Sequence, residues 1–179
     1  MSSAPEPDVE LLRAFNFRVK LFQSTPAAEG AADPTAAQQG RQLAGDGGFQ
    51  ECTGLDIELD LQELVEGGRN NGVIRRIGRA KYQPIALKRG MFSATKGAPV
   101  NKELWAWLQG VATGAQVVRF DGTVEVLDAR AGQPLVLARW SFVRGLPAKV
   151  SGPQLNARTG EVAIEELQIA HEGLILELQ

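Results

Sequence analysis

The chain has 179 residues, of which 44% are hydrophobic and 22% are charged, and this composition is that of an ordinary soluble globular protein. Its net charge of −2 argues against a dedicated nucleic-acid binder, which usually carries a basic excess. One cysteine, Cys52, cannot form an internal disulfide, so nothing indicates an oxidising compartment. The first residues lack the pattern of a signal peptide, and no stretch reaches the ~20 apolar residues of a membrane helix. We therefore expect a cytoplasmic, soluble product.

Two stretches near the start of the chain have little apolar content. Residues 1–12 contain proline and acidic residues, which predicts a flexible N-terminal arm ahead of a single domain at 13–179. Residues 23–48 consist mostly of Ala, Gly, Gln, Ser, Thr and Pro with a single leucine. Such a segment cannot bury enough apolar surface to offset the cost of ordering, so we expect a mobile inserted loop.

Alternation of apolar and polar residues predicts most of the strands. In residues 13–22, the apolar side chains on one face are Phe15, Phe17, Val19 and Leu21. The alternation resumes at residue 49, where the apolar face consists of Leu55, Ile57, Leu59 and Leu61. Further strands are predicted at 82–89, 116–120, 123–129, 134–143, 161–170 and 174–179.

One helix is predicted, because Leu104, Trp105, Leu108 and Val111 recur at helical spacing. Asn101 is the expected N-cap, and Gly110 and Gly114 are expected to end the helix. Trp105 shares the apolar stripe and is expected in the core, whereas Trp107 is expected to pack against another subunit. Many short strands and one helix predict a mainly β fold of two packed antiparallel sheets, forming a barrel or sandwich with the helix alongside.

A charge boundary crosses the middle of the chain. Residues 50–66 contain six acidic residues and no Lys or Arg, whereas residues 69–89 contain seven basic residues and no acid. One interpretation is a long hairpin in which opposite charges pair between its two arms. A second is that acidic and basic surfaces of different subunits meet and set the register of an assembly. Nucleic-acid binding is the least favoured, because the basic run lacks interleaved aromatic residues beyond Tyr82.

The sequence offers no constellation for catalysis, metal binding or a cofactor. Alternation places Asp56, Glu58 and Asp60 in one shared row, whereas general acid–base catalysis needs two carboxylates in different environments. His171 is the only histidine and has no partner for a metal cluster or a triad. Cys52 is expected to be a small buried apolar residue. We therefore expect no enzyme activity and no cofactor.

The strongest turn signal lies between the acidic and basic runs, at Gly67-Gly68 and Asn70-Asn71-Gly72. Glycines here permit positive φ and close approach of backbones. In a monomer these residues would form an ordinary hairpin tip, and in a polymer they would form a docking element.

Several short motifs occur in the order found in the tail tube proteins of contractile phage tails and of the related extracellular injection systems. The chain has FQECTGL at 49–55, where that family has F-x-E-x-S/T-G-L. The other motifs are EGGRN at 66–70, KYQPIALKRG at 81–90, LWAW at 104–107, PAK at 147–149, GP at 152–153, LNA at 155–157, IEEL at 164–167 and HEG at 171–173. The chain resembles this family over most of residues 13–173.

The resemblance implies hexameric rings that stack into a hollow tube inside a contractile sheath, with a fold shared with the haemolysin-coregulated protein of type VI secretion. It implies that strands of neighbouring subunits form a continuous barrel around the lumen, and that the hairpin at 66–78 contacts neighbouring subunits. The residues assigned to this contact are Glu66, Gly67, Gly68, Arg69, Asn70, Asn71, Arg75 and Arg76. The acidic row of Asp56, Glu58 and Asp60 is assigned to the lumen or to an interface.

The implied partners are the chain itself, contractile sheath subunits, baseplate and tube-terminating proteins, and cargo in the lumen, with no membrane and no sequence-specific nucleic acid. Assembly would take place in the bacterial cytoplasm, before the subunit becomes part of a tail or tail-like particle. The loop at 24–48 is longer than in typical members, which leaves open a baseplate-proximal initiator or adaptor of the same machine. A more distant alternative is a small-ligand-binding β-barrel, which would need a pocket with converging polar groups.

Overall fold

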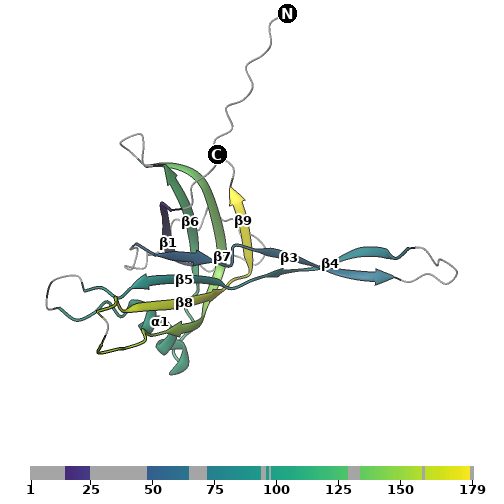
Figure 1. The fold of residues 1–179 in the computed structure, drawn as a ribbon. Coiled ribbons are helices and arrows are strands. Elements are labelled where there is room, and N and C mark those ends of the chain that lie inside the picture. Colours follow the sequence, from purple (N-terminus) through teal and green to yellow (C-terminus); the bar gives the residue numbers. More distant parts are fainter. Residues whose placement is uncertain are drawn as a thin grey trace, which may run out of the picture.

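The computed structural model describes residues 15–24, 48–64, 72–93, 96, 98–128, 134–158 and 160–177, whose arrangement is shown in Figure 1. The predicted arm at 1–12 lies outside these residues, as do residues 25–47 of the predicted loop. The described part contains nine strands and one helix. They are β1 (Phe17–Gln23), β2 (Glu51–Thr53), β3 (Ile57–Leu64), β4 (Ile74–Tyr82), β5 (Ile85–Gly90), α1 (Glu103–Ala112), β6 (Phe120–Asp128), β7 (Leu135–Ser151), β8 (Ile164–Ala170) and β9 (Gly173–Glu177).

Two antiparallel sheets share the long strand β7 (Figure 1). The first half of β7 pairs with β6, which continues to β1, and with β9 on its other side. The second half of β7 pairs with β8, which continues to β5 and the short edge strand β2. The strand order ends at β1 and at β2, so the described strands form an open sandwich rather than a closed barrel. The predicted mainly β fold with two antiparallel sheets and one helix is confirmed.

Strand β7 passes from one sheet to the other at a β-bulge around Arg144. One residue of β6, Asp121, faces two residues of β7, Val143 and Arg144, at this point, so the register shifts. Arg144 has a φ of 55°, a left-handed conformation that costs a non-glycine residue about 1–2 kcal/mol. Asp121 stabilises the bulge, because its Oδ1 accepts a hydrogen bond of 2.7 Å from the backbone N–H of Arg144. The resulting bend explains why β7 has 17 residues and extends past the strand predicted at 134–143.

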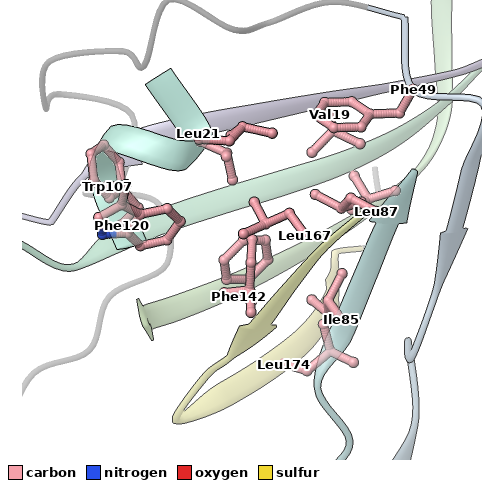
Figure 2. Close-up of a cluster of buried hydrophobic side chains, with 13 residues drawn as sticks. Val19, Leu21, Phe49, Ile85, Leu87, Trp107, Phe120, Phe142, Leu167 and Leu174 are labelled. Atoms are coloured by element: carbon pink, nitrogen blue, oxygen red, sulfur yellow. The ribbon is translucent and has the colours of Figure 1, made fainter. Parts of the chain in front are cut away.

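The core lies between the two sheets, and Figure 2 shows its apolar side chains. Phe142 is fully buried against β6, where a Cβ on Gly122 would lie only 2.4 Å from the Phe142 ring. Glycine is therefore required at this position of β6 for the ring to pack. The buried apolar residues are Val19, Leu21, Phe49, Ile85, Leu87, Leu104, Trp107, Phe120, Val124, Phe142, Leu167, Ile169 and Leu174.

The predicted strands occur with some changes of boundary. Phe17, Val19 and Leu21 face the core from β1 as expected, but Phe15 lies before the strand and is 78% exposed. The strand predicted at 123–129 corresponds to β6, which begins at Phe120, and residues 116–119 of the other predicted strand precede β6 and are not in a strand.

Helix α1 packs on the sandwich mainly through Leu104 and Trp107. The indole N–H of Trp107 donates to the carbonyl oxygen of Val118 at 2.8 Å, and its ring meets Phe120 edge-on at 4.7 Å. The prediction that Trp107 faces another subunit was therefore wrong. Trp107 lies three residues after Leu104. Residues that are three apart lie on the same face of a helix, just as residues that are four apart do.

The two ends of α1 agree with the sequence only in part. Lys102 occupies the N-cap position without a side-chain cap, so the predicted N-cap Asn101 was wrong by one residue, although its side chain accepts a hydrogen bond of 3.1 Å from the backbone N–H of Glu103. Gly114 has a φ of 83° and lies just beyond the helix, where glycine commonly ends helices. Gly110, by contrast, lies within the helix.

Candidate assembly interface

The most unusual feature of the molecule is a two-stranded hairpin that projects from the sandwich (Figure 1). Strands β3 and β4 pair only with each other, in a sheet of their own. They continue the chain of β2 and β5, so the hairpin extends outward from the second sheet. An isolated hairpin of two strands is marginally stable in water, which indicates that other contacts stabilise it.

One face of this hairpin is apolar and uncovered. Residues directly opposite each other in an antiparallel pair share a face, and the register places Ile57 opposite Tyr82, and Leu61 opposite Ile77. Of these, Leu61 and Ile77 are 62% and 71% exposed, which is unusual for large aliphatic side chains that occur together. We name this the apolar face of the hairpin, and it consists of Ile57, Leu59, Leu61, Ile77, Ala80 and Tyr82.

A second β-bulge allows both strands to contribute to this face. The register shifts between Leu59 and Leu61, so that β4 has one residue more than β3 in this interval. Without the extra residue, alternation along β4 from Ala80 would point Ile77 to the opposite face. Gly78 lies in the bulge, where an added Cβ would be 3.0 Å from the backbone oxygen of Asp60. Only glycine fits this close approach without displacement of β3.

The charges of the hairpin pair with one another within the chain. Lys81 Nζ lies 2.6 Å from Asp60 Oδ1, and Arg75 Nε lies 3.3 Å from Glu63 Oε1. The hydrogen bond to Asp60 raises the pKa of Lys81, and the charge of the same carboxylate adds to this effect. These contacts confirm the first of the interpretations of the charge boundary, a hairpin with paired charges.

Opposite charges also pair at the edge of the second sheet. Lys88 of β5 lies 3.0 Å from Glu51 of β2, and this hydrogen bond raises the pKa of Lys88, as does the charge of Glu51. The acidic and basic runs are thus adjacent antiparallel segments from the hairpin to the edge of the second sheet.

The structure places only some of the residues predicted to contact other subunits. Arg75 and Arg76 are exposed on β4, where they face Glu63 and Gln62 of β3, respectively. The tip residues lie outside the described part of the chain, and they are Glu66, Gly67, Gly68, Arg69, Asn70 and Asn71.

The predicted acidic row lies at and near β3. Asp56 precedes the strand and is exposed, Glu58 lies opposite Lys81, and Asp60 holds the ion pair with Lys81. Glu58 and Asp60 alternate with Ile57 and Leu59, so the acids lie on the face opposite the apolar face. The alternation predicted from the sequence is therefore confirmed for the strand itself.

The root of the hairpin is held by contacts that the sequence analysis missed. His171 Nε2 lies 3.1 Å from the carbonyl oxygen of Gln83, and its Nδ1 lies 3.0 Å from that of Gly173. Its ring also packs against Tyr82, with the ring centroids 5.5 Å apart. Burial lowers the pKa of His171, and the two carbonyl groups oppose this shift. His171 thus joins the end of β4 to the turn before β9.

Gly54 makes the second close contact at the root. Its φ is 86°, and an added Cβ would lie 2.1 Å from the carbonyl oxygen of Pro84. The TGL motif at 53–55 gave no indication of this contact, because Pro84 is 30 residues away from Gly54 in the chain.

Two charged clusters in the sandwich have structural roles. Arg89 and Glu165 are both 1% exposed and form an ion pair of 2.7 Å, and Glu165 also accepts a hydrogen bond from the indole N–H of Trp105. This cluster joins α1 to β5 and β8. It also places Trp105 against a buried carboxylate, whereas the sequence analysis expected Trp105 in the core because it shares the apolar stripe of the helix.

The second cluster surrounds Glu125 on the outer face of the first sheet. Burial raises the pKa of this carboxyl, but the hydrogen bond from Arg18 and the charges of Lys20, Arg18 and Arg139 outweigh burial, so the pKa is lowered.

Cys52 packs against the core, and burial raises the pKa of its thiol to about 11. Among the residues that the structure describes, no group of three or more His, Cys, Asp or Glu side chains could hold a metal ion. Nor does that part of the chain contain a helix long and apolar enough to span a membrane.

The fold and the hairpin define an open β-sandwich protein with an uncovered apolar extension, a type of surface through which chains associate. A family model described as T4-like virus tail tube protein gp19 matches residues 13–175. Since this match covers most of the 179 residues, the chain belongs to the T4-like tail tube protein family. No curated protein matches the chain.

Solved structures with the same fold include chains of PVC, an extracellular contractile injection system, and of the anti-feeding prophage. A chain of the PVC sheath/tube terminator in the extended state aligns with a TM-score of 0.71 and 19% identity, over 96% of this chain and 99% of that chain. A chain of the anti-feeding prophage baseplate, 6-fold symmetrised, aligns with a TM-score of 0.70 and 17% identity, over 97% of both chains. A chain of the PVC sheath–tube complex in the extended state aligns with a TM-score of 0.68 and 18% identity, over 93% of this chain and 91% of that chain. At these identities the likeness shows a shared fold.

Proposed function

We propose that this protein is the structural subunit of the inner tube of a contractile injection system or phage tail. Its chains form hexameric rings, and the rings stack into a hollow tube through which cargo passes. Membership of the tail tube family supports this proposal, as does the likeness to a chain from a baseplate described as 6-fold symmetrised.

The observation that carries the proposal is the uncovered apolar face of the hairpin. Burial of apolar surface contributes about 25 cal/mol per Å², so side chains as exposed as Leu61 and Ile77 are a substantial driving force for association. The ion pairs Glu63–Arg75 and Asp60–Lys81 form within the chain, whereas Leu61 and Ile77 remain largely exposed.

The open edges of the sandwich favour ring formation. In the second sheet, β2 and the second half of β7 are the two outer strands, and successive strands are antiparallel throughout. Because this sheet has four strands, the β2 edge of one copy would meet the β7 edge of the next in an antiparallel manner. Closure of a ring in this way would remove exposed strand edges, which otherwise promote aggregation.

The proposed partners follow from a position inside a contractile machine. They are other copies of the chain, sheath subunits, and the baseplate and tube-terminating proteins, with cargo in the lumen. The subunit would be made and assembled in the bacterial cytoplasm and then be part of a tail or tail-like particle.

Negative-stain electron microscopy across a concentration series tests the proposal. Six-fold rings and stacked tubes are expected, and particles that remain monomeric at every concentration would contradict self-assembly. A single ring that never stacks would instead favour the baseplate-proximal adaptor.

Two variants of adjacent β3 residues make this test specific to the apolar face. Leu61→Asp places a charge on the apolar face, and Gln62→Asp places the same charge on the opposite face of the same strand. Both positions are exposed, so both variants should fold as the wild type does. We expect Leu61→Asp to abolish assembly and Gln62→Asp to preserve it. Equal assembly of the two variants would show that the apolar face is not the contact.

A further inference from the structure

The second sheet has a polar face that points away from the core. Leu87 of β5 and Leu167 of β8 are buried, and they alternate with Lys88 and Glu166, which pair with each other and so share the opposite face. The residues of β2 and β7 that pair with these strands continue this face. We name it the polar face of the second sheet, and it consists of Glu51, Thr53, Ala86, Lys88, Lys149, Ser151, Glu166 and Gln168.

The dimensions of a ring determine which side this face lies on. Six second sheets joined edge to edge would form a barrel of about 24 strands, with a radius of about 24 Å at a strand spacing of about 4.8 Å and a tilt of about 40°. First sheets packed about 10 Å inside this barrel would have about 15 Å of circumference each. The four strands of the first sheet, β1, β6, β7 and β9, are together about 19 Å wide. The first sheets therefore fit only on the outside, and the polar face lines the lumen.

The acidic side chains of the polar face already have partners within the chain. Glu51 lies 3.0 Å from Lys88 Nζ, and Glu166 Oε1 accepts a hydrogen bond of 2.8 Å from Gln168 Nε2. Lys149 is exposed, and none of the ion pairs found among the described residues includes it. Lys149 therefore supplies a positive charge that is available to bind cargo.

We propose that Lys149 binds acidic stretches of a polypeptide cargo inside the tube. This inference rests on the proposed function and names the class of cargo. Nucleic acid fits the polar face less well, because its continuous run of phosphates would also lie against Glu51 and Glu166. The polar face also contains no aromatic side chain on which the bases of a single strand could stack. A polypeptide can place its acidic residues beside Lys149 and neutral residues beside the glutamates.

The spacing of the lysines keeps each contact weak. The six copies of Lys149 in a ring would lie about 25 Å apart around the lumen, which exceeds the screening length of about 10 Å at about 0.1 M salt. A single exposed ion pair contributes little to binding. Cargo that extends through several rings would be retained by many such contacts together and could still exchange them one at a time as it moves.

Cysteine labelling of assembled tubes tests whether the polar face lines the lumen. In a Cys52→Ala background, Lys149→Cys places a thiol on the polar face. The control Ile175→Cys places one on the outer face of the first sheet, where Ile175 is 47% exposed opposite Ser141. In tubes, a small maleimide should label both variants, and a maleimide coupled to a protein wider than the lumen should label only Ile175→Cys. Labelling of Lys149→Cys by the large reagent at the rate of the free monomer would overturn the inference.

Co-sedimentation of probes with assembled tubes tests the class of cargo. The probes are a fluorescent peptide of glutamates separated by Gly-Ser spacers, and a single-stranded DNA of similar length. We expect the peptide to bind wild-type tubes and Lys149→Gln to weaken this binding by about tenfold. Lys102→Gln is the matched control, because it removes an exposed lysine at the start of α1, away from the polar face, and it should leave binding unchanged.

Equal binding of the peptide by the two variants would overturn the inference. Tighter binding of the DNA than of the peptide would also overturn it, and would assign the lumen to nucleic acid. A wild type that forms no tubes would contradict the proposed function itself, which is a distinguishable result.

Discussion

Leu61 of β3 lies directly opposite Ile77 of β4, and both side chains are more exposed than buried, at 62% and 71%. A pair of large aliphatic residues on neighbouring strands normally packs against a core. Here the pair lies on a hairpin that extends beyond the core, and under the proposed function its packing partner is another copy of the chain. The predictions below separate this contact from the forces that hold the single chain together.

Assembly should depend only weakly on salt. The hairpin ion pairs Glu63–Arg75 and Asp60–Lys81 lie within one chain, so they do not need a second copy. We expect the concentration needed for assembly to change little between about 0.1 M and about 1 M NaCl, where the screening length falls from about 10 Å to about 3 Å. Light scattering across a salt series measures this. A steep loss of assembly with salt would show that acidic and basic surfaces meet between subunits.

Gly78→Val should impair assembly more than folding. A Cβ at Gly78 would lie 3.0 Å from the Asp60 backbone oxygen, so β3 and β4 must move by a few tenths of an ångström at the bulge that directs Ile77 to the apolar face. The hairpin is not part of the core, so the melting temperature should stay within a few degrees of the wild type. Gly160→Val is the control, because nothing lies within 4 Å of a Cβ there. Tubes formed normally by Gly78→Val would contradict the role of the bulge.

The sequence predicted which strands have two different faces, but it could not show what covers each face. Val19 and Leu21 of β1 and Leu59 and Leu61 of β3 follow the same alternation, yet the first pair is buried and the second is exposed. The alternation shows that a strand has one apolar and one polar face. Whether the apolar face packs against the core or against another chain depends on the position of the strand in the fold.

Other features depend on long-range contacts that a single sequence does not reveal. The bend of β7 at Arg144 needs a left-handed arginine, whereas turn signals in sequences are read from glycine and asparagine. The root contact of His171 with Gln83 joins residues 88 positions apart. The turn residues and charge runs of the hairpin were visible in the sequence because they are local, and the pairing of Asp60 with Lys81 agrees with one of the interpretations that they left open.

The buried ion pair of Arg89 and Glu165 should behave as a unit. Glu165→Leu leaves the guanidinium of Arg89 buried beside an apolar group, which should lower the free energy of unfolding by about 3–5 kcal/mol. The double variant Arg89→Met with Glu165→Leu removes both charges and should recover most of this loss, because apolar replacement of a complete buried pair is often neutral or stabilising. Denaturant unfolding of the wild type, both single variants and the double variant measures the coupling. Additive losses would show that the two residues act independently.

Arg144→Gly should be more stable than Arg144→Ala by about 1 kcal/mol. Both variants lose the ion pair of Arg144 with Glu172, so the difference between them reports the left-handed backbone at φ 55°. Glycine adopts this conformation without a steric penalty, whereas alanine retains the Cβ. The difference in melting temperature between the two variants should be about 2–4 °C. Equal stability would show that the bulge imposes no strain.

His171 should make the stability of the chain depend on pH below neutrality. Burial lowers its pKa from the usual 6.5, so as pH falls through that value the unfolded chain binds a proton that the folded chain does not. Stability should therefore be constant above about pH 7 and should decline as pH falls toward the folded-state pKa. His171 is the only histidine, so a His171→Gln variant should show a flatter profile between about pH 8 and pH 5. Chemical denaturation at a series of pH values measures both curves, and identical slopes in the two proteins would assign the pH dependence to carboxylates instead.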